Sequence, residues 1–278
     1  MKDYWKYVLI VIALLIVVLG TLLIIGNLKK IDDNDLKIYF FNAGKADACV
    51  ISINGKHMMI DTGEKELANE ALQYFKDNKI EKLDYLIITH FDKDHVGGAA
   101  KIIDNIEIGK VFDSTYIKDS EEYNDYASAL IVNKVGAEHV TDKKEISLDS
   151  LKITIIGTDS IFDNNESNNS SLIVSIIDKN NKFLFTGDIQ NARIKEYLSD
   201  YKDTYDFIKI PYHGHYMKRL DDLLETVKPK YAVITSSEKE KEDDQTVNLL
   251  RNLGIKYYLT REGSITIRSN GNYIDINQ

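Results

Sequence analysis

The stretch Thr89-His90-Phe91-Asp92-Lys93-Asp94-His95-Val96-Gly97-Gly98 directly follows an apolar run at residues 83–88. It places two imidazoles and two carboxylates within six residues, a density of metal ligands that seldom arises by chance. If the apolar run is a buried strand, the turn after it brings these donors to the strand's carboxyl end, where open α/β sheets place their sites. Such donors suit Zn²⁺, Mn²⁺ or iron. The alternative is a polar loop that begins a helix with Asp94 as its cap.

Two later segments place similar residues after a predicted strand. Thr186-Gly187-Asp188 follows residues 182–185, and we expect Asp188 either to bridge two metals or to cap the helix after it. Pro211-Tyr212-His213-Gly214-His215 follows residues 207–210. We expect His213 to be a metal ligand, and His215 to be either a substrate-side residue or simply exposed.

The remaining candidates are less specific. Asp61-Thr62-Gly63 also puts a carboxylate and a glycine at a strand's end, and a single copy argues against an aspartic protease. For His57 and His139, which lie outside such loops, we expect structural or surface roles.

The N-terminus carries an apolar run of 18 residues, 8–25, which is long enough for a tilted membrane helix. Trp5 and Tyr7 stand where an interfacial aromatic belt would lie. Because Gly26-Asn27-Leu28-Lys29 follows in place of a small-x-small cleavage site, we favour an uncleaved anchor over a signal peptide. Lysines flank both sides of the run, so orientation is weakly determined, and we expect a short cytoplasmic tail with an extracytoplasmic domain.

Length and charge limit the rest of the chain. At 278 residues with 44% hydrophobic content, the length fits one large domain. We expect a tail and anchor at 1–30, a linker at 31–35 and a domain at 36–278. Residues 1–30 carry +3 of the net −9, so the remainder carries −12, which disfavours a broad electrostatic grip on nucleic acid. The single Cys49 excludes an internal disulfide.

Strand and helix patterns alternate through the domain, and Asn54-Gly55 predicts a tight hairpin. Residues 159–170 are expected to form a long loop. Both halves are rich in strands, which favours two mixed sheets packed face to face with helices outside, an α+β arrangement. The predicted helices are 66–78, 97–105, 121–135, 192–199, 220–227 and 244–253. The predicted strands are 36–41, 49–53, 57–60, 83–89, 110–112, 151–156, 171–178, 182–186, 207–210, 231–235, 255–259, 264–268 and 273–276.

Taken together, these segments resemble the metallo-β-lactamase superfamily, and within it the hydrolase domain of the ComEC competence proteins. Phe41-Asn42-Ala43-Gly44-Lys45-Ala46-Asp47-Ala48 is similar to that subgroup's Asp-Val-Gly-Gln-Gly-Asp-Ala opening, and the motifs at residues 61–63, 186–188 and 213–214 follow in the family order. The resemblance spans about residues 36–278. It implies an αββα sandwich with a binuclear metal site between the sheets.

The resemblance also implies roles for single residues. His90 and Asp92 would hold one Zn²⁺ or Mn²⁺ ion, Asp94 and His95 with His213 the other, and Asp188 would bridge. A hydroxide held between the two ions would attack the substrate, and metal coordination makes water nucleophilic near neutral pH. Asp94 and His215 are the candidate catalytic residues. The other candidate residues of the site loops are Lys45, Asp47, Asp61, Asn169 and Ser170.

Several positions depart from the family pattern. Asp92 replaces the middle histidine of His-x-His-x-Asp-His, as in the competence subgroup, and this favours harder metals such as Mn²⁺. In place of a third-motif histidine the chain has Asn169-Ser170-Ser171-Leu172, so we expect the first metal to be weakly held. Tyr212 stands where the subgroup has His-His-Gly, Asn42 replaces an aspartate, and the charged run 238–243 replaces a segment that usually bears a histidine.

Two classes of function follow. The first is a membrane-anchored metallohydrolase that acts on a phosphodiester, either DNA or RNA or a cell-envelope ester such as a teichoic acid or a phosphocholine ester. β-Lactam hydrolysis is disfavoured by Asp92. The second is a non-catalytic binding domain that keeps the fold, which retention of six candidate ligands disfavours. Because fold alone does not fix function, the choice of substrate rests on the resemblance.

Overall fold

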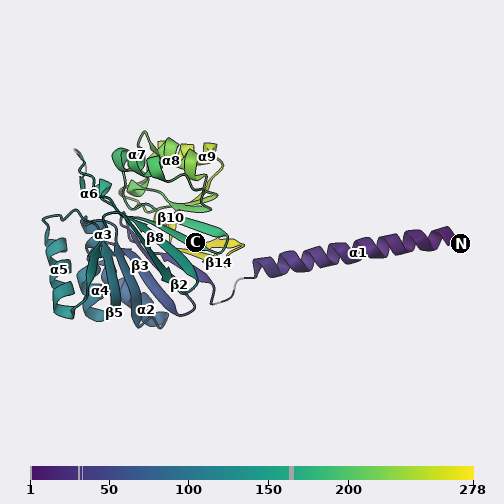
Figure 1. Ribbon diagram of the computed structural model, residues 1–278, viewed down its shortest axis with the longest axis horizontal. Coiled ribbons are helices and arrows are strands. Elements are labelled where there is room, and N and C mark those ends of the chain that lie inside the picture. Colours follow the sequence, from purple (N-terminus) through teal and green to yellow (C-terminus); the bar gives the residue numbers. More distant parts are fainter. Residues whose placement is uncertain (1, 31, 33, 163–165) are drawn as a thin grey trace.

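Two β-sheets lie face to face in the computed structural model, and helices cover the outer face of each (Figure 1). The structure describes residues 2–30, 32, 34–162 and 166–278. Helices α2, α4 and α5 pack on one side, and α7, α8 and α9 on the other. The predicted αββα sandwich of two mixed sheets is confirmed.

The first sheet has eight strands in the described part of the chain. Strands β3 to β6, which end at one edge of the sheet, run parallel, whereas the pairs β1–β2, β2–β3, β1–β14 and β14–β15 are antiparallel. In the β2–β3 hairpin, Asn54 and Gly55 have φ of 47° and 73°, the left-handed values that a two-residue turn requires. The strands in spatial order are β15 (Ile274–Asn277), β14 (Ile265–Ser269), β1 (Leu36–Phe40), β2 (Ala48–Ile53), β3 (Lys56–Thr62), β4 (Lys82–Ile88), β5 (Glu107–Asp113) and β6 (Ala137–His139).

The second sheet has seven strands among the described residues. Strands β10 to β13 are parallel, and β7 to β10 form an antiparallel meander. The order is β13 (Lys256–Leu259), β12 (Tyr231–Ile234), β11 (Phe207–Lys209), β10 (Asn181–Phe185), β9 (Ile173–Asp178), β8 (Leu151–Ile156) and β7 (Lys143–Leu148).

Three apolar clusters hold these layers together. One lies between the sheets, and the other two lie between each sheet and its helices. The longer helices bury one face, which is why their apolar residues recur at helical spacing. The helices are α2 (Leu67–Asp77), α3 (Lys93–Val96), α4 (Ala99–Asn105), α5 (Glu121–Asn133), α6 (Glu166–Asn169), α7 (Asn191–Asp200), α8 (Leu220–Val227) and α9 (Asp244–Asn252), with 3₁₀ turns at Tyr212–Gly214 and Thr260–Glu262.

Helix α1 (Lys2–Lys29) projects away from the sandwich (Figure 1). Its window Trp5–Leu23 has a mean hydropathy of 2.7 and is not buried against the domain. By length and composition this helix can cross a membrane. Its 28 residues extend about 42 Å at about 1.5 Å per residue, more than the ~30 Å of a hydrocarbon core.

Several expectations need correction. The strands β6 and β7 were not expected, and the helix predicted at 97–105 is preceded by a separate turn, α3. The N-cap of α3 is Asp92, not Asp94, and its side chain makes no capping bond. The loop expected at 159–170 contains the short helix α6, and its residues 163–165 lie outside the described residues, as do residues 31 and 33 of the expected linker.

Candidate metal centre

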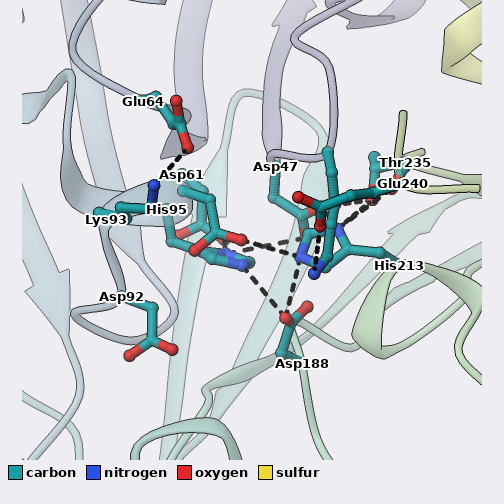
Figure 2. Close-up of polar contacts among 12 residues, drawn as sticks. Asp47, Asp61, Glu64, Asp92, Lys93, His95, Asp188, His213, Thr235 and Glu240 are labelled. Carbon is teal, nitrogen blue, oxygen red and sulfur yellow. Dashed lines mark hydrogen bonds and ion pairs between the residues drawn. The ribbon is translucent and has the colours of Figure 1, made fainter. Parts of the chain in front are cut away.

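The candidate site lies where the carboxyl ends of parallel strands from both sheets meet. Asp61 stands near the end of β3, and His90 follows β4. Across the interface Asp188 follows β10, and His213 lies in the turn after β11. Figure 2 shows the side chains of His95, Asp188 and His213 pointing toward one another, as expected for loops at one edge of the sandwich.

The loop conformations that aim these side chains are unusual. Asp61, Tyr212 and His213 all have φ near +50°, a left-handed conformation that costs energy for residues other than glycine. At Gly187, a Cβ would lie 2.9 Å from that of Ser171 and 3.1 Å from that of Thr89, so only glycine fits where the sheets converge. Strain of this kind is typical of sites where function fixes the backbone.

One group of donors surrounds Asp188. Its Oδ2 atom lies 3.0 Å from Nε2 of His213 and 3.4 Å from Nε2 of His95. On the open side, Oδ2 of Asp94 lies 3.2 Å from Nε2 of His213. Ligand atoms of Asp47, His95, Asp188 and His213 also lie within 4.8 Å of one another. The structure therefore brings together the four residues expected at the second metal position, which are Asp94, His95, Asp188 and His213.

The second ring nitrogen of each histidine is held by the protein. Nδ1 of His95 lies 2.8 Å from Oδ2 of Asp61, and Nδ1 of His213 lies 3.1 Å from the carbonyl oxygen of Thr235. Nδ1 of His90 lies 3.2 Å from the Ser171 hydroxyl. Metal-binding histidines are usually oriented by such partners.

The opposite nitrogen, Nε2, of His90, His95 and His213 is buried and has no hydrogen-bond partner among the described residues. A buried polar atom without a hydrogen bond is costly. Nε2 of His95 and His213 face Oδ2 of Asp188 at 3.4 and 3.0 Å without forming a hydrogen bond, so all three nitrogens are available to a ligand at this position. Neutral imidazoles with adjacent carboxylates fit a divalent cation. The donor set therefore fits the metal that the fold family implies.

Asp92 stands at the margin of the group (Figure 2). Its Oδ2 lies 3.8 Å from Nε2 of His90, while its Oδ1 accepts hydrogen bonds from Lys118 at 2.7 Å and from Ser167. The expected first metal position thus has an imidazole and a carboxylate in reach, but one oxygen of that carboxylate already accepts two hydrogen bonds.

A buried lysine lies beneath the site. Nζ of Lys209 forms an ion pair with Asp47, lies 3.4 Å from Oδ1 of Asp188 and donates to the carbonyl of Gly187 at 3.0 Å. The hydroxyl of Thr235 donates to the other oxygen of Asp47 at 2.6 Å. Buried charges require such pairing, and Lys209 offsets two of the carboxylates.

The buried charges shift the protonation of the histidines. Burial and the neighbouring His95 lower the pKa of His90 to about 4, so this ring is neutral. Burial opposes the charge on His213, yet the carboxylates of Asp188 and Asp94 raise its pKa to about 9. For His95, likewise, Asp188 and Asp61 outweigh burial and raise the pKa well above its usual value. In the metal-free protein, protons on the rings of His95 and His213 neutralise part of the charge of the nearby carboxylates. A bound cation would replace these protons.

The other candidate residues lie at the edge of this group of donors or farther from it. Lys45 pairs with Glu240 at 2.9 Å, and His215 is partly exposed, with Nδ1 3.5 Å from Asp243. Asn169 accepts backbone N–H groups at the start of α7, and the Ser170 hydroxyl bonds the carbonyl of Ser167, so neither side chain joins the ligands.

Sequence reasoning missed Lys209, Thr235, Ser171 and Lys118. A lysine inside the otherwise apolar strand Phe207-Ile208-Lys209-Ile210 was a usable signal, because lysine is almost never fully buried without a partner. Lys118 carried no such signal, since it lies 26 positions from Asp92 in a polar loop.

A family model described as the metallo-beta-lactamase superfamily matches residues 42–236. Among curated proteins, Recombination protein 2 of Haemophilus influenzae is 25% identical over 216 residues, which cover 75% of this chain and 25% of that protein. ComE operon protein 3 of Bacillus subtilis is 22% identical over 181 residues, covering 64% and 23% respectively. Both belong to the ComEC family, so the predicted likeness to that subgroup is confirmed. The match spans about a quarter of each relative's length.

Among solved structures, the metallo-beta-lactamase fold protein YhfI of Bacillus subtilis superposes with a TM-score of 0.57 at 10% identity, covering 82% of this chain and 98% of that one. This likeness supports the fold alone.

Proposed function

The chain belongs to the metallo-beta-lactamase superfamily, and on that premise we propose that it is a membrane-anchored binuclear phosphodiesterase. The observation that carries the proposal is the convergence of three buried imidazole Nε2 atoms, none of which forms a hydrogen bond among the described residues, with the carboxylates of Asp94 and Asp188. A domain that only displayed a surface would not need to keep such costly groups buried.

The proposed ligand sets follow the geometry. His90 and Asp92 would hold one cation, Asp94, His95 and His213 would hold the other, and Asp188 would be shared by both. When bound, divalent ions such as Mn²⁺ or Zn²⁺ would supply Lewis acidity and bring the pKa of water near neutrality.

The chain's own side chains complete the reaction in this proposal. Asp94, whose side chain is one-fifth exposed, would orient the attacking water as well as contact a cation. His215 is partly exposed, with Nδ1 3.5 Å from Asp243, and in this proposal its ring is the proton donor to the leaving oxygen. Lys209 stays fixed beneath Asp47 and Asp188 and keeps their carboxylates in place.

A phosphodiester is the substrate class that fits best. Asp92 gives the first position an oxygen donor where the superfamily pattern has imidazole, which favours a hard cation, and hard cations favour phosphate oxygen. The names of the two relatives, a recombination protein and a protein of the ComE operon, suggest nucleic acid. The acidic domain offers little electrostatic grip on a long polyanion, so an envelope phosphodiester stays in the proposal.

The first test is metal content and turnover of the full-length chain in detergent. We expect about two metals per chain and metal-dependent hydrolysis of bis(p-nitrophenyl) phosphate, lost in Asp188→Ala and His95→Ala. Asp178→Asn is the matched control, because Asp178 is a buried carboxylate far from the site that pairs with Ser269. Hydrolysis of a β-lactam but not of the diester would overturn the substrate class. Bound metal without turnover of any ester would favour the binding domain.

A further inference from the structure

Among the described ion pairs, Lys118 is the lysine that contacts Asp92, as Lys209 is the lysine that contacts Asp188. Lys118 lies in the segment between β5 and α5, and its side chain is about 40% exposed. Its Nζ donates to Oδ1 of Asp92 at 2.7 Å. Ser167, on α6, donates to the same oxygen. One oxygen of this proposed ligand is therefore already engaged by a cation that belongs to the chain.

The two proposed metal positions differ in the contacts of the carboxylate that belongs to each position alone. At the second position, Asp94 pairs with His213, and no lysine contacts its carboxylate among the described ion pairs. At the first position, Lys118 forms an ion pair with Asp92, whose other oxygen lies 3.8 Å from Nε2 of the buried His90. Asp188 is common to both. A divalent cation entering the first position must approach an ammonium group on the same carboxylate, and like charges at short range in a partly buried site repel strongly.

We propose that Lys118 sets the order of metal loading, so that the second position fills first and the first position fills only weakly. The proposal rests on the metallohydrolase function proposed above. In the singly loaded protein, the ammonium of Lys118 supplies the positive charge beside Asp92 that a second ion would otherwise supply.

A purely structural reading of the same contact is that Lys118 ties the β5–α5 segment to the loop after β4. That reading predicts a loss of stability when Lys118 is replaced, with no change in how tightly the second ion binds. The electrostatic reading predicts the opposite pattern, because removing a positive charge helps a cation to bind.

The experiment is a Mn²⁺ titration of the full-length, chelator-treated protein in detergent. Bound ion is measured by equilibrium dialysis, and paired ions by the spin-coupled electron paramagnetic resonance signal. We expect the unchanged chain to bind one ion tightly and a second at least ~100-fold more weakly. Lys118→Met should tighten the weak event about tenfold, a change of the size that ligand-contacting residues produce in metal affinity. The tight event should stay within about twofold.

Further variants show whether the effect is due to the charge of Lys118. Lys118→Arg keeps the positive charge and should keep the weak second event. Lys93→Met is the matched control, because Lys93 begins helix α3 directly after Asp92 but pairs with Glu64 at 3.2 Å and not with Asp92. Asp92→Asn should remove the weak event and leave the tight one. Lys118→Gln replaces the methionine variant if the latter does not fold.

The outcomes separate this inference from the proposed function. Equal affinities for both ions, or a weak event unchanged in Lys118→Met, would overturn the role of Lys118 even if the chain hydrolyses a phosphodiester. Two ions bound in the expected order without turnover would support the role of Lys118 and overturn the phosphodiesterase. A chain that binds no Mn²⁺ would overturn both.

Discussion

The carboxylate of Asp61 lies 2.8 Å from Nδ1 of His95, and both groups are fully buried. The same carboxylate accepts the backbone N–H of Thr89 at 2.7 Å and its hydroxyl at 2.7 Å. Asp61 thus links the end of β3 to the end of β4 and fixes the ring of His95 so that Nε2 faces Asp188. The residue acts on the metal centre through the ligand it positions.

Replacing Asp61 by asparagine should therefore weaken the centre without removing a proposed ligand. We expect metal affinity to fall about 10- to 100-fold, the usual cost of losing a partner of a metal-binding histidine. Equilibrium dialysis with Mn²⁺ measures the change. Asp178→Asn, which alters a buried carboxylate paired with Ser269, should leave affinity unchanged. Equal affinity in Asp61→Asn and the unchanged chain would contradict the positioning role.

Lys209→Met tests the buried ammonium. Removing it leaves Asp47 and Asp188 without their shared counter-ion, and breaking a buried pair in this way costs about 3–5 kcal/mol. We expect that loss in the free energy of unfolding of the metal-free protein, measured with urea, and partial recovery when Mn²⁺ is added. Lys230→Met is the control, because its pair with Asp206 is exposed and should contribute at most about 1 kcal/mol. Similar losses in both variants would show that Lys209 does not balance the site.

The sequence predicts those parts of the fold and site that local patterns determine. Asp61, His90, Asp188 and His213 each follow an apolar strand, and the parallel strands then bring them to one edge. Strands β6 and β7 were not predicted, and the reason is physical. Both are edge strands. β6 has only three residues, and β7 begins with three consecutive charged residues and buries only Leu148, so the periodic signal is weak.

Contacts between distant loops are harder to foresee. Thr235 reaches Asp47 across 188 positions, and Ser171 reaches His90 across 81. Such pairs depend on how the two sheets pack, and no spacing within the chain encodes them. Residues that orient ligands are therefore harder to predict from the sequence than the ligands themselves, which can be recognised by residue type and position.

The protonation of His213 gives a pH test. Its pKa in the folded, metal-free chain is raised to about 9, above the ~6.5 of an unfolded histidine. A raised pKa contributes stability that is full below about pH 6.5 and is lost as pH rises through about 9. We expect the metal-free protein to lose on the order of 2 kcal/mol between pH 6.5 and 9.5 in urea unfolding with a chelator present. His213→Gln should show a smaller loss. A stability that rises with pH over this interval would exclude a protonated His213.

The last prediction concerns helix α1. Because its window Trp5–Leu23 is strongly apolar and not buried against the domain, the hydrophobic effect should place it in a bilayer. We expect the full chain to sediment with membranes and a chain lacking residues 1–30 to stay in the supernatant. Turnover per molecule should be the same in both, because the proposed ligands all lie on the sandwich. Replacing Leu14 and Leu15 by arginine keeps the length and should also release the chain, since charges at the centre of a span are costly. Cleavage of the domain by a protease added to intact cells would support the proposed extracytoplasmic orientation, and protection of the domain until the cells are lysed would reverse it. A truncated chain that still sediments would show that the membrane contact lies on the domain itself.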